Sequence, residues 1–258
     1  MPIDNSTNKY SIFQAYNLGL QRSKGSVICF LHDDVILHTS NWGLKIIEIF
    51  SRDKEIGLVG VVGSKFKSSI PSAWWHCSSD NYVINLIQHT QSGKVRKQIE
   101  GFKNHSFQEE VAVIDGVFMA MRKVDGIKFD SCMNGYHNYD LNLSFEFHRQ
   151  GYKVMVTNEI LIEHLSEGTI DKSWYNSSIT IHKNNLDILP LAVGEKNIRS
   201  EERVAGLYFI NEALKYDDKG EALKVLLKIF YMKPISKYHF GLLIKIVFNK
   251  PLLIKSLK

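Results

Sequence analysis

An uncharged apolar run near the start of the chain leads directly into three side chains that can do chemistry. The run Val27–Leu31 ("VICFL") precedes His32, Asp33 and Asp34. Such a run is typical of a strand buried on both faces, and in open α/β sheets ligands bind beyond the carboxyl ends of the strands. Acids placed there can hold a divalent cation that bridges phosphates, or they can hydrogen-bond ribose hydroxyls. The structural alternative is an acid pair that caps a helix or closes a loop.

Two later positions carry side chains of the same kinds. Asp140 stands just ahead of Asn142–Gln150, a segment with helical periodicity that should end at Gly151. An acid in this place is also a good helix N-cap. His164 follows a short apolar run. A single histidine is more often a satisfied polar residue than a ligand, so neither position decides the chemistry alone.

The elements that would position these residues alternate along the first part of the chain. Helical periodicity marks Tyr10–Arg22, Trp42–Ser51 and Asn142–Gln150. Apolar, strand-like runs are Val27–Leu31, Gly57–Gly63, Val111–Met121, Lys153–Thr157 and Ile160–Ile162. This alternation predicts an α/β fold with a mostly parallel sheet and helices on both faces.

Two regions depart from the alternation. Between residues 68 and 110 the pattern loosens, and a hairpin is expected where Gln91-Ser92-Gly93 separates Tyr82–Gln88 from Lys94–Ile99. Beyond Trp174 the pattern is helical, first over residues 173–189 and 203–215 and then in two basic apolar segments. We therefore expect one domain over residues 1–172 and a helical, basic C-terminal region over residues 173–258.

Composition limits the classes of protein that remain. Apolar residues make up 44% and charged residues 23% of the chain, which is typical of a globular protein. The three cysteines lack metal-ligand spacing, which favours a reducing, cytoplasmic compartment. Residues 221–258 contain eight lysines and one acid, a net charge of +7. Because the net charge of the whole chain is +5, residues 1–220 carry −2. The basic character belongs to the C-terminal region, which argues against a main domain that binds nucleic acid.

The strand end "FLHDDVIL" resembles the D-x-D region of family 2 glycosyltransferases with the GT-A fold. In the matching register, Asp34 takes the place of the metal-binding acid and His32 replaces the first Asp. Asp33 lies between them, where the resemblance allows a contact to the ribose. The resemblance implies a donor site for a sugar nucleotide.

The segment "YDLNLSFEFHRQGYKV" (residues 139–154) resembles the part of that family that carries the general base. Asp140 falls on the catalytic Asp, Tyr139 replaces the preceding Glu, and Asn142 replaces a second Asp. The upstream "GYHNYD" resembles a subset of these transferases with H-x-Y-D, which implies that His137 and Tyr139 border the acceptor. Trp74 and Trp75 could add an aromatic platform for a sugar ring, although a tryptophan pair is more often part of a core.

Three more stretches resemble the family in the same order along the chain. In "VIDGVFMAMRK", Gly116 would let the backbone approach the substrate closely. In "ILIEHLSEGT", His164 takes the place of a histidine that reaches the metal or the diphosphate. In "PIDNS", Asp4 would lie near the nucleotide base. The family's first strand and helix are not found ahead of this motif, so either the chain is truncated or its nucleotide pocket is incomplete.

The resemblance, which covers roughly residues 2–170, implies an inverting glycosyltransferase. A nucleoside diphosphate sugar, foremost a UDP-sugar, would bind through Mg²⁺ or Mn²⁺ held by Asp34 and His164. Asp140 would deprotonate the hydroxyl of a glycan or a lipid-linked acceptor. The family's usual products imply a role in polysaccharide biosynthesis.

Two other functions stay open from the sequence. The substitutions at His32, Tyr139 and Asn142 are compatible with a noncatalytic sugar-nucleotide or glycan-binding scaffold on a degenerate transferase fold. A metal-dependent nucleotidyltransferase or phosphohydrolase has less support, because no P-loop or second carboxylate cluster is present. For the basic C-terminal region, peripheral contact with an anionic membrane and packing as a helical cap or in a homodimer are equal alternatives.

Overall fold

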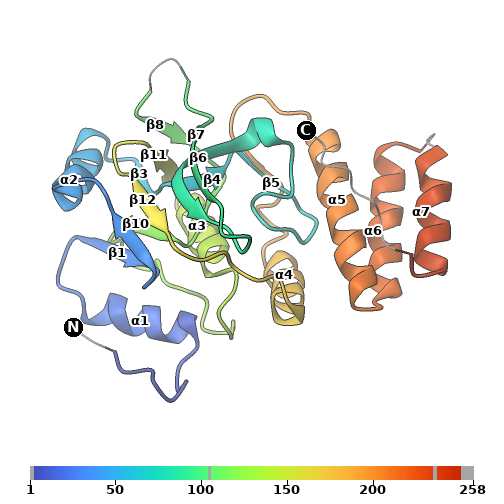
Figure 1. The fold of residues 1–258 in the computed structure, drawn as a ribbon, viewed down its shortest axis with the longest axis horizontal. Coiled ribbons are helices and arrows are strands. Elements are labelled where there is room, and N and C mark those ends of the chain that lie inside the picture. Colours follow the sequence, from blue (N-terminus) through green and yellow to red (C-terminus); the bar gives the residue numbers. More distant parts are fainter. Residues whose placement is uncertain (1–2, 104–105, 235–236, 251–258) are drawn as a thin grey trace.

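The computed structural model describes residues 3–103, 106–234 and 237–250. Its central sheet contains five strands in the order β1-β10-β3-β11-β8 (Figure 1). These strands are β1 (Val27–Leu31), β10 (Phe118–Arg122), β3 (Ile56–Gly60), β11 (Lys153–Thr157) and β8 (Gln108–Glu110). The α/β fold class predicted from the sequence is confirmed, and β1 and β11 have the predicted bounds.

The directions of the strands correct one detail of that prediction. Strand β11 pairs with β3 in parallel, but β10 lies between β1 and β3 and is antiparallel to both. Strand β8 is antiparallel to β11. Strands β1, β3 and β11 therefore share one direction, while most of the neighbouring pairs in this sheet are antiparallel. The sequence pattern could not reveal this, because a strand buried on both faces has the same apolar run in either direction.

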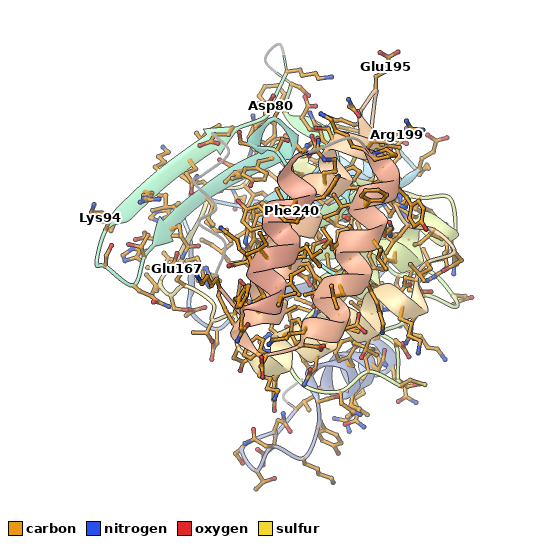
Figure 2. The ribbon with its side chains drawn as sticks, turned by 90° about the vertical axis from the view of Figure 1, so that its right-hand side faces the viewer. Asp80, Lys94, Glu167, Glu195, Arg199 and Phe240 are labelled. Carbon is orange, nitrogen blue, oxygen red and sulfur yellow. The ribbon has the colours of Figure 1, made fainter. Side chains whose placement is uncertain are left out.

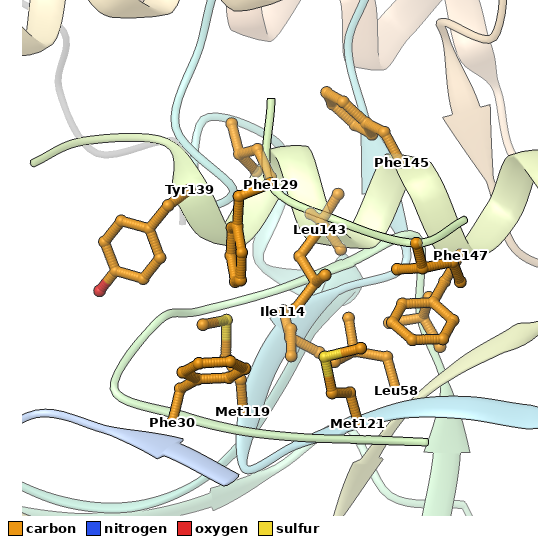
Figure 3. Packing of buried hydrophobic residues seen from close by; sticks show 14 of the residues in the cluster. Phe30, Leu58, Ile114, Met119, Met121, Phe129, Tyr139, Leu143, Phe145 and Phe147 are labelled. Atoms are coloured by element: carbon orange, nitrogen blue, oxygen red, sulfur yellow. The ribbon is translucent and has the colours of Figure 1, made fainter. Parts of the chain in front are cut away.

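Helices cover both faces of the central sheet. The alternate residues Ile28 and Phe30 of β1 pack in one core cluster with Phe13 and Leu20 of α1 (Ile12–Arg22). Helix α3 (Tyr139–Arg149) contributes its own buried residues to this cluster. The opposite face packs against α2 (Trp42–Arg52) in a second cluster. Figure 3 shows the first cluster, with Tyr139 at its margin and its hydroxyl turned away from the other side chains.

A second sheet lies beside the first and supplies part of the candidate site. Its strands follow the order β2-β12-β6-β4-β9, and β7 pairs with β6. They are β2 (Val35–Leu37), β12 (Ile162–His164), β6 (Tyr82–His89), β4 (Val62–Ser64), β9 (Val113–Ile114) and β7 (Val95–Glu100). The antiparallel β6–β7 hairpin confirms the turn predicted at residues 91–93. The apolar run 57–63 is divided between β3 and β4, so one predicted strand serves both sheets.

Local capping explains where the helices near the site begin. Helix α1 starts after Ser11, whose side chain accepts from the Gln14 backbone in a capping box. Helix α3 begins at Tyr139, three residues earlier than predicted, and its N-cap is Asn138 in the left-handed conformation (φ 64°). Asp140 therefore lies inside the first helical turn and is not the N-cap. The interpretation of Asp140 as a capping residue is wrong.

The C-terminal part is helical, as predicted. It contains α4 (Lys172–Asn184), α5 (Ile198–Lys215), α6 (Lys219–Met232) and α7 (Lys237–Val247), and a short β13 (Leu191–Ala192) pairs with β5 (Phe66–Lys67). A third core cluster joins α5–α7 to Trp174 of α4 and to Ile70 and Ala73 of the loop after β5. None of the helices in the described residues is both long and apolar enough to cross a membrane. The division at residues 172 and 173 stays a prediction.

Candidate active site

Three side chains from the two sheets converge at the end of β1. The Nδ1 atom of His32 lies 3.2 Å from Nε2 of His164, and that Nε2 lies 3.3 Å from Oδ1 of Asp34. The third side of the triangle, from His32 Nδ1 to Asp34 Oδ1, measures 3.9 Å. His32 and Asp34 follow β1, whereas His164 ends β12, so the neighbouring ends of two strands bring the three ligand atoms together.

Each imidazole has a partner on the nitrogen that faces away from this cluster. His32 Nε2 lies 2.7 Å from the hydroxyl of Tyr139, and His164 Nδ1 lies 3.0 Å from Oε1 of Gln88. Neutral imidazoles with the proton on these outer nitrogens donate to Tyr139 and Gln88. The lone pairs of the inner nitrogens then point at the cluster. This is how outer partners commonly orient histidine ligands of a metal.

The charge balance at the cluster favours an ionised Asp34 and a neutral His164. Burial raises the pKa of Asp34, but the hydrogen bond from Ser166 and the charges of His164 and His32 outweigh burial, so the pKa lies below its usual value. Burial lowers the pKa of His164, although Asp34 acts in the opposite direction. At neutral pH the site therefore offers one carboxylate and at least one neutral imidazole, the forms that bind a cation.

The chemistry of this donor set fits a divalent transition metal. Magnesium prefers oxygen ligands alone, whereas manganese and zinc accept imidazole beside carboxylate. With two imidazoles and one carboxylate, His32, Asp34 and His164 fit a transition-metal ion better than Mg²⁺. His164 was predicted as a ligand together with Asp34, but the role of His32 was left open. The structure gives His32 the position of a third ligand.

Tyr139 connects the cluster to the first turn of α3. Its ring is buried and packs against Gly116, where a Cβ atom would lie 2.3 Å from the tyrosine hydroxyl. A side chain at position 116 would displace Tyr139, so Gly116 permits the bond from Tyr139 to His32. Tyr139 was predicted to bind the acceptor, and the structure adds a contact with His32 of the His32–Asp34–His164 cluster. That predicted role in acceptor binding stays a prediction.

Asp140 is held in an environment that raises its affinity for a proton. Burial, followed by the negative charge of Asp115, raises the pKa of Asp140 to about 7. Hydrogen bonds from the backbone amides of Leu141 and Gly116 act in the opposite direction and hold the carboxylate in place. A carboxyl group with a pKa near neutrality suits a general base, because it is both ionised and basic at physiological pH.

A single cavity brings most of the predicted residues together. Its volume is about 720 Å³, which is within the range of small-molecule sites. Asp140 and the two histidines of the cluster line it. The other predicted residues on its wall are Trp74, Trp75, Gly116, His137 and Tyr139. The two tryptophan rings lie edge to face, with their centroids 5.2 Å apart. Both residues are half-buried and pack against the core as well as lining the cavity.

Three residues of the predicted donor site, Asp4, Asp33 and Asp34, are not part of the cavity wall, although Asp34 contacts His164, which is. Asp4 is exposed, is not part of the cavity wall, and accepts from the backbone amide of Ser6 at 3.0 Å. Asp33 is exposed, whereas its neighbour Asp34 turns toward His164. The structure therefore does not bring Asp4 and Asp33 to the cavity, and their contacts with a nucleotide stay predictions.

Three residues that shape the site have no role assigned from the sequence. Gln88 orients His164, and nothing in the loosely patterned region around it indicates this role. Ser166 donates to Asp34 and lies within the "HLSEGT" motif, which could have revealed it. Asp115 accepts a hydrogen bond from Trp74 Nε1 at 2.7 Å, which holds the Trp74 ring in the cavity wall. Its negative charge also raises the pKa of Asp140.

Comparisons with known proteins give a family for the chain and two similar solved structures. A family model described as "Glycosyltransferase like family" matches residues 1–186. The structure is similar to a crystal structure of GalNAc-T7 with UDP, GalNAc and Mn²⁺ at 12% sequence identity and a TM-score of 0.48, and the match covers 90% of this chain and 44% of that chain. It is also similar to a protein from STIV at 15% identity and a TM-score of 0.32, covering 61% and 64% of the two chains. No curated protein sequence matches significantly.

The family match settles the class to which the chain belongs. It spans well over half of the 258 residues and includes every position of the candidate site. This chain spans less than half of the GalNAc-T7 chain. The enzyme class predicted from the motifs is confirmed at the level of the family: the chain is a member of the glycosyltransferase-like family.

Proposed function

We propose that the chain transfers a sugar from a nucleoside diphosphate sugar to an acceptor hydroxyl, with inversion at the anomeric carbon. One observation carries this proposal. In the cluster of His32, Asp34 and His164, His32 contacts the hydroxyl of Tyr139, the residue before Asp140. Asp140 lines the same cavity as both histidines. A group that can hold a cation and a group that can accept a proton thus face one space.

The three ligand side chains would hold Mn²⁺ in preference to Mg²⁺. When bound, the ion would neutralise the negative charge that grows on a departing diphosphate, without a proton donor. Tyr139 and Gln88 keep the two imidazoles oriented for this task. Ser166 does the same for Asp34.

Asp140 would act as the general base. The acceptor hydroxyl gives its proton to the Asp140 carboxylate while its oxygen forms a bond to the anomeric carbon. The bond from that carbon to the diphosphate oxygen breaks, and its electron pair leaves with the diphosphate. Attack from the face opposite the leaving group inverts the configuration. A positioned base of this kind contributes about 10²–10⁴-fold to the rate.

The remaining predicted residues supply binding surface in this proposal. Trp74 and Trp75 offer an aromatic wall on which a sugar ring can stack, and His137 lies on the same wall, 3.5 Å from Asp171. We propose a UDP-sugar as donor and a glycan or a lipid-linked acceptor. We also propose a cytoplasmic location, because the cysteines Cys29, Cys77 and Cys132 are all free, which fits a reducing compartment.

The proposal is tested by screening sugar nucleotides with the full chain, Mn²⁺ and glycan acceptors, and by following products with mass spectrometry. We expect ion-dependent release of a nucleoside diphosphate and a matching increase in acceptor mass. Anomeric inversion would be read from the product by NMR. Donor binding with neither hydrolysis nor transfer would favour the noncatalytic scaffold instead.

A further inference from the structure

Helix α7 is apolar on both of its sides, although only one side is packed. Leu242 and Ile246 face the third core cluster and are buried. On the other side, Phe240, Val247 and the following Phe248 are exposed by 71%, 55% and 66%. Large apolar side chains that gather on one exposed side of a helix commonly mark an interaction surface. The exposed side of α7 therefore calls for a partner.

Helix α6 extends this exposed apolar surface. Leu226 and Ile229 face the core, whereas Leu227, Phe230 and Tyr231 point outward. We call the exposed residues Leu227, Phe230, Tyr231, Phe240, Val247 and Phe248 the outer apolar face. Helices α5, α6 and α7 form one end of the molecule in Figure 1, and Figure 2 shows that end from outside, with Phe240 on the front.

Lysines border the outer apolar face. Lys233 and Lys250 are exposed, Lys245 is half-buried, and none of the three forms an ion pair with the part of the chain that the structure describes. At the start of α6, Glu221 pairs with Lys224, so Asp217 and Asp218 are the two acids there that stay without an ion pair among the described residues, against three such lysines. The border of the face is therefore net positive.

We propose that the outer apolar face docks onto an anionic membrane surface. Apolar side chains flanked by lysines suit the boundary between acyl chains and negatively charged headgroups. A second copy of the chain fits less well, because a twofold contact would bring two lysine-bordered faces of the same positive charge together. The inference stands on α6 and α7 alone and does not depend on the proposed function.

Docking through this face would orient the cavity relative to the membrane. Trp174 and Ala73 line the cavity and also belong to the core cluster beneath α5–α7. The cavity wall and the outer apolar face thus share one packed core.

The proposal is tested by sedimenting the full chain with vesicles of phosphatidylcholine, with or without phosphatidylglycerol, at low and high salt. We expect binding to the anionic vesicles that weakens with salt. The double variant Phe240→Ser, Phe248→Ser should lower the partition coefficient about tenfold or more. The triple variant Lys233→Gln, Lys245→Gln, Lys250→Gln should lower it roughly 100-fold and reduce its salt dependence.

Matched controls remove the same kinds of side chain elsewhere. Leu44→Ser with Phe107→Ser removes two exposed apolar groups, and Lys24→Gln, Lys94→Gln, Lys97→Gln removes three exposed lysines. Both controls should bind like the wild-type chain, and thermal melting should confirm that every variant is folded. Equal binding to neutral and anionic vesicles would overturn the proposal, as would equal losses in variants and controls. A dimer in sedimentation velocity that Phe240→Ser dissociates would assign the face to a second copy.

Discussion

The cavity wall and the outer apolar face differ in how the chain assembles them. Residues of the cavity wall come from distant segments, and the polar groups of its cluster each have a partner within the molecule. The outer apolar face comes from two consecutive helices and the residue that follows, and its side chains are 41% to 79% exposed in the part of the chain that the structure describes. The difference teaches that a site for chemistry needs polar side chains oriented by hydrogen-bond partners. A docking surface needs only apolar side chains that recur on the exposed side of a helix.

The largest expected effect is on the cavity wall, at the proposed base. Asp140→Asn should lower kcat by about 10²–10⁴-fold, because the amide cannot accept the acceptor proton. Donor affinity, measured by calorimetry with a sugar nucleotide and Mn²⁺, should stay unchanged. Glu146→Gln, on the same helix but outside the cavity wall, is the control and should retain activity. Equal, small effects of both substitutions would remove Asp140 from the mechanism.

The next effect concerns a residue that acts through a ligand. Gln88→Leu removes the acceptor for His164 Nδ1 and should weaken Mn²⁺ affinity by about 10–100-fold. Gln98→Leu is a close control, since Gln98 also lines the cavity but its amide lies 3.5 Å from Glu100. Titration of free Mn²⁺ by EPR measures both. Identical affinities would show that His164 does not need Gln88, or does not bind the ion.

The pH dependence of turnover should report Asp140. Its pKa of about 7 predicts that kcat rises roughly tenfold per pH unit below pH 7 and levels off above it. The raised pKa also means that the folded chain holds this proton more tightly than the unfolded chain. Asp140 therefore lowers stability as pH rises from about 4 to about 7, and Asp140→Asn should raise Tm at pH 8 more than at pH 4. A flat kcat profile from pH 5 to pH 8 would contradict this assignment.

A smaller effect is expected on stability at Gly116. A Cβ at this position would lie 2.3 Å from the Tyr139 hydroxyl, so Gly116→Ala should cost about 1–3 kcal/mol of unfolding free energy. It should also weaken Mn²⁺ binding, since Tyr139 must leave His32. Gly43→Ala in α2, where a Cβ would meet nothing within 4 Å, is the control and should be neutral or stabilising. Urea denaturation measures the free energy of unfolding of both variants. An unchanged free energy of unfolding for Gly116→Ala would contradict the tight packing of Gly116 against Tyr139.

The smallest effect belongs to the outer apolar face. Phe240→Ser replaces a side chain that is 71% exposed, so the free energy of unfolding should change by less than about 0.5 kcal/mol. The same urea experiment measures it. A loss of several kcal/mol would mean that Phe240 is covered in the folded chain, and the contrast between the two regions would fail.

The sequence predicted the elements of the fold better than their arrangement. The runs at 27–31 and 153–157 matched strands exactly, since continuous apolar segments of that length have few other uses. The antiparallel insertion of β10 could not be predicted, because burial on both faces hides strand direction. At the site, spacing and resemblance indicated Asp34, Asp140 and His164. Gln88 and the link from Tyr139 to His32 depend on contacts across more than 70 residues, which local patterns do not encode.

The most direct test is pulsed EPR of Mn²⁺ bound to the full chain, which detects hyperfine coupling to the nitrogen of a coordinated imidazole. If His32, Asp34 and His164 hold one ion, the wild-type chain should show nitrogen coupling. The coupling should weaken in His32→Ala and in His164→Ala, and it should vanish in the double variant. Bound Mn²⁺ without nitrogen coupling, or coupling that survives in the double variant, would place the ion elsewhere and contradict the proposed active site.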